Sequence, residues 1–435
     1  MKIGFLSMPL TGHLNPMTTL ARRLKARGHE VVFFGVLDCG PIVRAAKLDF
    51  VSYCKEEYPV GSVAKLFGPV AKLPGLEGVR YTAWNILPGI VRATLNKLPE
   101  KLVETGVEAL VLDTVYRFTE LMPIRLGMPY AQIWNILHLD RSGATPPYYF
   151  SWPHETTPEA LARNMEGVKA MGGFFGPMAE VAKAYAEKEG LQIEWSNPAA
   201  TVSKVAVITQ TPREFDFSGA PWPPAFHYAG PFHDEGGRED VPFAWERLTG
   251  ETLVYASLGT LVNGLEQVFR TILEAVKTIP GVQLVLSAGS VVDLDELGPV
   301  PSNAIVVRKA PQIELLKRAA LCITHAGLNT ALESLAQGVP MVAMPIGFDQ
   351  PGVASRIAYH GVGELVEVED LTVEGLAGLI QKVLKDTSYR DKARAFQKVI
   401  AQTRGLDVAV DVLERELEKS LAGRPDTKRA ELSHF

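Results

Sequence analysis

Short, uninterrupted apolar runs alternate with longer stretches of helical periodicity along the chain. Residues 2–7 (KIGFLS) and 30–35 (EVVFFG) form the first two runs, and the helix between them has capping residues at Asn15, Pro16 and Gly28. Apolar runs without polar alternation are typical of strands buried on both faces. A strand, a helix and a strand in this order predict a βαβ unit, and therefore a parallel sheet whose ligand site lies beyond the carboxyl ends of its strands.

The same alternation continues in both halves of the chain, with further strands expected at residues 109–112, 130–134, 205–209, 252–257, 282–287, 304–307, 321–324 and 340–344. Between the halves, residues 212–240 lose periodicity and gather proline and glycine, which is the composition of a linker. We therefore predict an α/β protein of two Rossmann-like parallel-sheet domains that face a central cleft. The expected domain ranges are 1–220, a linker at 221–240, 241–405, and 406–435 as a helix that packs back on the first domain and ends in a frayed tail.

Composition narrows the class of protein. The 435 residues are 47% hydrophobic, carry a formal net charge of -5 and contain no block of like charges, so no nucleic-acid partner is expected. The three cysteines, Cys39, Cys54 and Cys322, are widely separated and are expected to be buried small hydrophobes in a reducing compartment. With no apolar run of about 18 residues and no signal peptide, we predict a cytoplasmic protein without a transmembrane segment.

The most informative stretch, residues 323–334, is predicted to be a strand, a glycine turn and a helix. His325 and Gly327 fall in the turn, while Asn329 and Thr330 begin the helix. Unpaired backbone N–H groups and the positive end of the helix dipole converge at such a turn. The expected ligand of this turn is a diphosphate.

Three further polar residues complete a pattern suited to a nucleotide sugar. Glu333 follows Asn329 by one helical turn, where a carboxylate accepts hydrogen bonds from a vicinal diol such as that of a ribose. Asp349 and Gln350 follow an apolar strand, at the end where a pair of acceptors would hold the hydroxyls of the transferred sugar.

These residues resemble the carboxyl-terminal signature of the UDP-dependent glycosyltransferases of the GT-B fold, and residues 348–360 are most similar to the carotenoid glucosyltransferase branch. The match rests on His325, Gly327, Asn329, Glu333, Gly338, Pro340, Asp349 and Gln350. The resemblance implies that His325, Asn329 and Thr330 contact the diphosphate, with Ser257 and Thr260 facing it from a Ser-x-Gly-Thr turn. It also implies that Gln312 contacts the base, Glu333 the ribose, and Asp349 with Gln350 the sugar. Lys309 stands where the family often has a tryptophan over the base, so UDP and dTDP both stay open.

A second match lies near the amino terminus. Gly12-His13-Leu-Asn-Pro16 is similar to the family's Gly-His-x-x-Pro, whose histidine deprotonates the acceptor hydroxyl. A histidine with a pKa of about 6.5 is partly neutral in the cytoplasm and can accept that proton. Asp113, which ends the predicted strand 109–112, is the expected orienting carboxylate.

The implied reaction is a single in-line displacement with inversion, from UDP-glucose or a related nucleotide sugar to a hydroxyl of an apolar small molecule. It requires no metal and no further cofactor. The acidic pair Asp293 and Asp295 is read as a solvated turn rather than a metal site. If the acceptor is a lipid, the enzyme would work at the periphery of a membrane.

The acceptor pocket is expected in the first domain. Residues 58–98 are predicted to be an insertion facing the substrate, and the aromatic-rich segments 134–152 and 171–176 fit a pocket wall and a core equally well. Asn135 resembles a family position that faces the donor sugar.

Two other functions fit a nucleotide-sugar site. A UDP-sugar epimerase of the same fold and a non-catalytic nucleotide-sugar binding protein both remain, although neither requires His13 with Asp113. A dinucleotide oxidoreductase is excluded because no GxGxxG turn follows the first strand.

Overall fold

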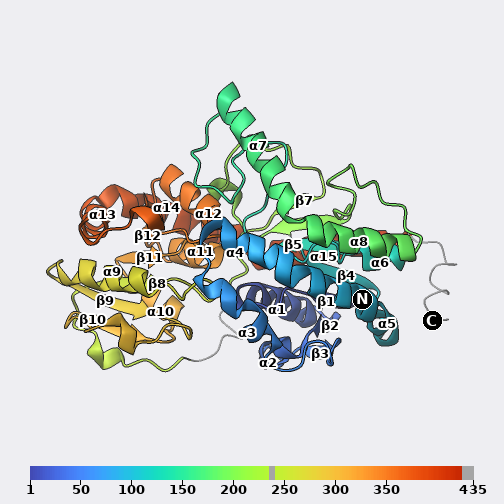
Figure 1. The fold of residues 1–435 in the computed structure, drawn as a ribbon, viewed down its shortest axis with the longest axis horizontal. Coiled ribbons are helices and arrows are strands. Elements are labelled where there is room, and N and C mark those ends of the chain that lie inside the picture. Colours follow the sequence, from blue (N-terminus) through green and yellow to red (C-terminus); the bar gives the residue numbers. More distant parts are fainter. Residues whose placement is uncertain (235–240, 424–435) are drawn as a thin grey trace.

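The computed structural model describes residues 1–234 and 241–423. Two parallel sheets form the centres of two domains, one at each end of the long axis of the molecule (Figure 1). The first sheet has the strand order β3-β2-β1-β4-β5-β6-β7 and the second β10-β9-β8-β11-β12-β13. The predicted fold class is confirmed.

The first domain wraps helices around both faces of its sheet. Alternate residues of β1 face opposite cores: Ile3 and Phe5 pack with helices α1 and α15, and Leu6 with α5 and α8. This double burial explains why its strands read as continuous apolar runs. Its strands are β1 (Lys2–Leu6), β2 (Glu30–Gly35), β3 (Asp49–Ser52), β4 (Ala109–Asp113), β5 (Tyr130–Trp134), β6 (Ala206–Thr209) and β7 (Phe226–Tyr228). Its helices are α1 (Thr11–Ala26), α2 (Gly40–Ala45), α3 (Ser62–Phe67), α4 (Gly75–Tyr81), α5 (Leu87–Thr105), α6 (Leu121–Arg125), α7 (Pro158–Phe174) and α8 (Gly176–Lys188), of which α7 projects from the body of the molecule (Figure 1).

The second domain repeats the architecture with a smaller sheet. Its strands are β8 (Thr252–Ser257), β9 (Val282–Ser287), β10 (Ala304–Val307), β11 (Leu321–Thr324), β12 (Met341–Ala343) and β13 (Gly363–Leu365). Its helices are α9 (Glu266–Lys277), α10 (Gln312–Leu316), α11 (Leu328–Ala336), α12 (Gln350–Tyr359), α13 (Val373–Lys385) and α14 (Thr387–Thr403). The carboxyl ends of β8 and β11 lead directly into the turns singled out in the sequence.

The last helix, α15 (Gly405–Ala422), returns to the first domain. Its apolar face joins the core beneath α1, and Arg27, directly after α1, pairs with Asp411 and Glu414 at 2.6 and 3.0 Å. The tail expected to fray lies outside the described residues from 424 onward. The helix thus ties the end of the chain to the domain that begins it.

The expected linker range, 221–240, needs correction. Residues 226–228 form β7, which pairs in parallel with β6 as the edge strand of the first sheet. The run is only three residues long and lies among prolines, so its periodicity gave no strand signal. The connection between the domains therefore follows Tyr228, and residues 235–240 lie outside the described residues.

Helix α1 begins earlier than its capping residues indicated. It starts at Thr11, so Asn15 and Pro16 lie inside the helix and His13 is in its first turn rather than before it. The carbonyl of Leu10 accepts hydrogen bonds from the N–H groups of His13 and Leu14, at 2.9 and 2.8 Å. Backbone geometry after β1, and not a side-chain cap, sets this start.

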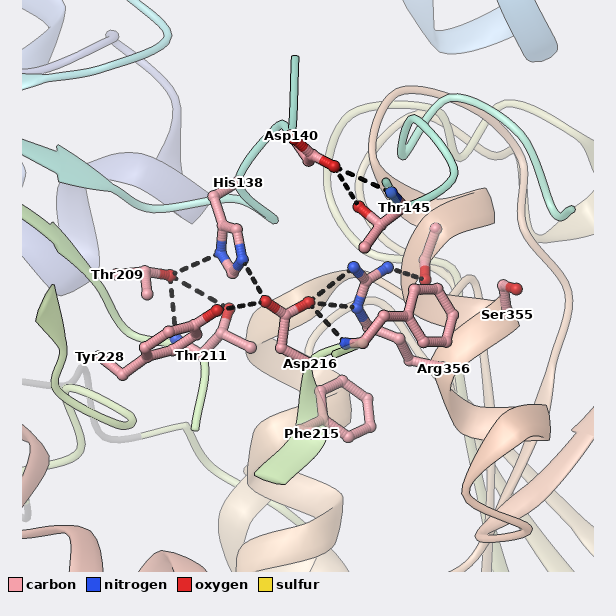
Figure 2. Close-up of polar contacts among 12 residues, drawn as sticks. His138, Asp140, Thr145, Thr209, Thr211, Phe215, Asp216, Tyr228, Ser355 and Arg356 are labelled. Carbon is pink, nitrogen blue, oxygen red and sulfur yellow. Dashed lines mark hydrogen bonds and ion pairs between the residues drawn. The ribbon is translucent and has the colours of Figure 1, made fainter. Parts of the chain in front are cut away.

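A buried polar cluster joins the two domains (Figure 2). Asp216 of the first domain accepts hydrogen bonds from both Nε and Nη2 of Arg356 on α12, at 3.1 and 2.7 Å. The Asp216 carboxylate also accepts from His138 Nε2 at 2.7 Å and from the Tyr228 hydroxyl at 2.6 Å. Because Asp216 and Arg356 are 8% and 2% exposed, their charges are held away from water and depend on one another.

Two further expectations concern the whole described chain. All three cysteines are buried and unpaired, as predicted. Among residues 1–234 and 241–423, no helix combines the length and apolar character needed to cross a membrane.

Candidate active site

A cavity of about 940 Å³ is lined by both domains and follows the carboxyl ends of their strands. This volume is at the upper end of the range for small-molecule sites, which gives room for two substrates. The sequence-predicted residues that line it are His13, Ser257, Thr260, Gln312, His325, Gly327, Asn329, Thr330, Glu333, Asp349 and Gln350. Asp113 lies behind His13 and does not line the cavity wall.

The pair of His13 and Asp113 is built by two neighbouring elements. Asp113 ends β4, next to β1, and α1 carries His13 back over that edge so that Nδ1 lies 2.8 Å from Asp113 Oδ2. The backbone N–H of Met8 donates to the same oxygen at 3.2 Å, and the N–H of Val115 donates to the other at 3.2 Å. With Nδ1 bound to the carboxylate, the Nε2 atom is the one available to a substrate proton.

Electrostatics shift the pKa values of His13 and Asp113 in opposite directions. Burial opposes the protonated form of His13, but the charge and hydrogen bond of Asp113, with a contribution from the charge of Asp349, outweigh it and raise the His13 pKa above its usual value. For Asp113, burial favours the neutral acid, yet the interaction with His13 and the two backbone N–H groups lowers its pKa. The carboxylate therefore stays charged while the imidazole gains and loses its proton.

His325 occupies a strained turn after β11. Ala326, which follows it, has φ of 60°, a left-handed conformation that is uncommon for a residue with a Cβ and occurs at functional sites. A Cβ atom added at Gly259 or Gly327 would lie 2.5 or 2.4 Å from His325 Nε2, so two glycines enclose the ring. Burial lowers the pKa of His325 to about 4, which makes the ring neutral at physiological pH and able to act only through a hydrogen bond.

The amino end of α11 faces the cavity without a side-chain cap. Gly327 is the N-cap and the first turn holds no acidic residue. The unpaired N–H groups of this turn, together with the helix dipole, make the position suitable for an anion. The location expected for the diphosphate is thus an open helix terminus.

The side chain of Asn329 is used for a contact between domains. Its Nδ2 donates to the carbonyl of Gly12 at 2.9 Å, and its Oδ1 accepts from Gln210 Nε2 at 2.9 Å. Gln210 also donates to the carbonyl of Asn135 at 2.9 Å. The role predicted for Asn329 at a phosphate would therefore fall to its backbone N–H.

Gln312 and Glu333 are joined to each other. Gln312 Nε2 donates to Glu333 Oε2 at 2.7 Å, and the Tyr255 hydroxyl donates to Gln312 Oε1 at 3.0 Å. Glu333 is 5% exposed, so Gln312 fixes a buried carboxylate on the cavity wall. The contacts predicted for these two residues with a ribose and a base stay predictions.

Asp349 and Gln350 lie where α12 begins. Asp349 Oδ2 accepts from the backbone N–H of Leu137 in the first domain at 2.9 Å, and burial raises the pKa of this carboxyl. Gln350 Oε1 accepts from the N–H groups of Ile346 and Gly347 at 2.8 and 3.0 Å, which directs its amide nitrogen away from that loop. Both side chains are positioned by backbone groups, as a rigid binding site requires.

Asp293 and Asp295 do not line the cavity. Both are exposed, and Asp293 Oδ1 accepts from the backbone N–H of Asp295 at 3.1 Å, which is a local turn. Across the described part of the chain, no three His, Cys, Asp or Glu side chains come together in a way that would hold a metal ion. Lys309 is exposed and lines the cavity near Gln312.

Some aromatic residues of segments 134–152 and 171–176 line the cavity, and others lie outside its lining. The cavity is lined by Trp134, Tyr148, Tyr149 and Phe175. Phe150 and Trp152 lie outside its lining and stack on each other with their ring centroids 4.1 Å apart. Part of the 58–98 segment also reaches the cavity, through residues such as Phe67 and Leu87, and Gly75 bridges to Gly347 of the second domain. Asn135 lines the cavity as well, with both amide atoms buried and unpartnered within the described residues.

Sequence reasoning missed Gln210, Glu120 and Gln132, which also line the cavity. Gln210 directly follows β6, so the rule that polar residues at strand ends form the site would have found it. Glu120 and Gln132 carried no such signal, because one precedes a five-residue helix and the other lies within a strand.

Comparisons with known proteins agree with this geometry. Residues 204–414 match the family model described as "UDP-glucoronosyl and UDP-glucosyl transferase". The chain is 26% identical to a zeaxanthin glucosyltransferase of Pantoea ananas over 94% of both chains, and 29% identical to a demethyllactenocin mycarosyltransferase of Streptomyces fradiae over 95% of this chain and 86% of that one. Among solved structures, the glycosyltransferase of kitacinnamycin superimposes with a TM-score of 0.73 at 23% identity, covering 95% of this chain and 98% of that one.

The two facing parallel sheets, the helix terminus after β11 and the whole-length similarity lead to one assignment. Residues 204–414 belong with the UDP-glucoronosyl and UDP-glucosyl transferases that their family model describes, and the chain as a whole has the fold of solved GT-B glycosyltransferases.

Proposed function

We propose that the enzyme transfers glucose from UDP-glucose to a hydroxyl of an apolar small molecule, with inversion at the anomeric carbon. The observation that carries this proposal is the 2.8 Å contact between His13 Nδ1 and Asp113 Oδ2 at the wall of the cavity that also holds the amino end of α11. His13 Nε2 takes the proton of the acceptor hydroxyl. The hydroxyl oxygen attacks the anomeric carbon of glucose, and the bond between that carbon and the UDP oxygen breaks.

The leaving diphosphate requires stabilisation of negative charge. We propose that the N–H groups at the start of α11 and the neutral ring of His325 provide it, without a metal ion; the uncapped helix terminus and the lowered pKa of His325 support this. A glucosyl donor is supported by the zeaxanthin glucosyltransferase name of one relative, and an apolar acceptor by the aromatic lining of the cavity.

The test compares the parent enzyme with His13→Ala. UDP release and product mass are measured with UDP-glucose and a panel of hydroxylated apolar acceptors, with and without a chelator. We expect glycosylated product, no effect of the chelator, and a loss of about 10²–10⁴-fold in kcat for His13→Ala. UDP affinity, measured by calorimetry, should remain near that of the parent.

Two results would contradict the proposal. An equally active His13→Ala enzyme would remove the general base from the mechanism. Conversion of UDP-glucose to another UDP-sugar without any acceptor would make the enzyme an epimerase.

A further inference from the structure

A buried carboxyl lies on the cavity wall apart from both the donor residues and His13. Glu120 is 4% exposed, and its Oε2 atom has no hydrogen-bond partner within the described residues, although the residue lines the cavity. Buried polar atoms are nearly always paired, because leaving one unpaired costs free energy. Since Glu120 lines the cavity, a ligand group that displaces the atoms now covering Oε2 would complete this carboxyl.

The orientation of this carboxyl is fixed by Gln132 of β5. The backbone N–H of Ser203 donates to Gln132 Oε1 at 2.8 Å, and Gln132 Nε2 donates to Glu120 Oε1 at 2.6 Å. Because a backbone N–H only donates, the Gln132 amide has one satisfactory orientation, and Glu120 Oε1 must be an acceptor. Any proton on the neutral acid therefore resides on Oε2, the atom without a partner.

The charges around Glu120 suit a neutral ligand group. Burial raises its pKa to about 7, while backbone hydrogen bonds and the charges of Arg117 and Arg141 oppose that rise. Both cations have other contacts: Arg117 lies 4.9 Å above the ring of Phe175, and Arg141 donates to the carbonyl of Pro198. A hydroxyl pairs with Glu120 in either state, since it donates to the carboxylate and accepts from the acid.

Glu120 and His13 are reached from opposite faces of the first sheet. In the pairing of β4 with β5, Gln132 is beside Leu112, and Ile133 is beside Asp113. Since successive side chains of a strand alternate, Gln132 and Asp113 point to different faces. The cavity reaches both Glu120 and His13, so a molecule that contacts both must extend around the carboxyl edge of the sheet, past Trp134.

We propose that Glu120 determines acceptor specificity by binding a second hydroxyl of the acceptor, distant from the hydroxyl that receives the sugar. This inference rests on the proposed transferase function and deepens it: the acceptor class is an elongated apolar molecule with two separated hydroxyls. Gln132 acts as a positioning residue that holds the carboxyl in place.

The test uses linear aliphatic α,ω-diols of increasing chain length and the matching mono-alcohols. For the parent enzyme at its best chain length, we expect kcat/KM for the diol to exceed that for the mono-alcohol about tenfold, because one buried hydrogen bond to a carboxyl is worth about 1.5 kcal/mol or more. In Glu120→Leu the ratio should fall to about one, mainly through KM. Glu120→Gln should keep part of the preference, because its amide oxygen accepts from Gln132 and its amide nitrogen donates to the hydroxyl.

Controls separate this inference from the proposed function and from misfolding. Glu100→Leu makes the same replacement on the exposed side of α5, away from the cavity, and should leave the diol preference intact. Calorimetry measures the affinities for diol and mono-alcohol in the presence of UDP, and so tests the Glu120 contact without turnover. The affinity for UDP shows whether each variant is folded. A parent enzyme with no diol preference in binding or turnover, or an unchanged preference in Glu120→Leu, would overturn the inference. Preferential diol binding without any product would instead contradict the transferase mechanism alone.

Discussion

Asn329 of the second domain donates a hydrogen bond from its side chain to the backbone carbonyl of Gly12, 2.9 Å away in the first helix of the first domain. In a regular helix that carbonyl would accept from the N–H four residues later, but this position is Pro16, which has none. The proline inside α1 thus leaves an acceptor one residue before His13, and α11 of the second domain supplies its partner. This contact connects the proposed base to the second domain.

Replacing Asn329 by alanine should loosen this connection. We expect the free energy of unfolding to fall by about 1 kcal/mol, the usual worth of one hydrogen bond. Asn329→Asp should be at least as destabilising, because a carboxylate oxygen would then face the Gly12 carbonyl. Thermal unfolding of both variants checks this. An Asn329→Asp variant as stable as the parent would show that the hydrogen bond to the Gly12 carbonyl does not stabilise the protein.

The pair of His13 and Asp113 predicts a pH dependence with a definite sign. The base must be neutral, so kcat/KM should rise with pH through the His13 pKa, which lies above its usual value. In Asp113→Asn the carboxylate no longer raises that pKa while burial still lowers it, so the acidic limb of the profile should move to lower pH. The maximum rate should also fall, by about 10²–10⁴-fold. A profile that keeps its position would separate Asp113 from the titration of His13.

Gly259 and Gly281 form a matched pair of glycines. Their φ values are 75° and 72°, so alanine is strained to a similar extent at both, by about 1–2 kcal/mol. Only at Gly259 does the added Cβ meet His325, at 2.5 Å, whereas at Gly281 it meets nothing within 4 Å. Calorimetry should therefore find UDP binding weakened about tenfold or more in Gly259→Ala and unchanged in Gly281→Ala. Equal UDP affinities in the two variants would argue against a donor role for His325.

The buried pair of Asp216 and Arg356 should matter for stability (Figure 2). Arg356→Met leaves the carboxylate without its cation across the domain boundary, and we expect a loss of about 3–5 kcal/mol in the free energy of unfolding. Arg356→Lys keeps the charge but loses the two-point contact, so its loss should be smaller. Adding Asp216→Asn to Arg356→Met should recover part of the loss, because no unpaired charge is then buried. Urea unfolding measures the free energy of unfolding of all three variants. A double variant that recovers none of the loss of Arg356→Met would contradict the pairing.

The sequence alone determined the alternation of strands and helices and the order of polar groups in the second domain. Strands such as β1 and β8 are buried on both faces, so their apolar runs are readable without a structure. The residues from His325 to Gln350 that are predicted to bind the donor follow strand ends, and parallel strands gather such ends at one edge of a sheet. Local spacing therefore sufficed to place them on one cavity.

Only the tertiary structure decided which side chains meet across that cavity. The strand at residues 226–228 and the joining of Gln312 to Glu333 each depend on neighbours distant in sequence. Glu120 is the clearest case: nothing beside it in the chain indicates chemistry, and its importance comes from burial against Gln132 at the wall of the cavity. Burial and hydrogen-bond partners belong to the packed chain, whereas periodicity and spacing belong to the sequence.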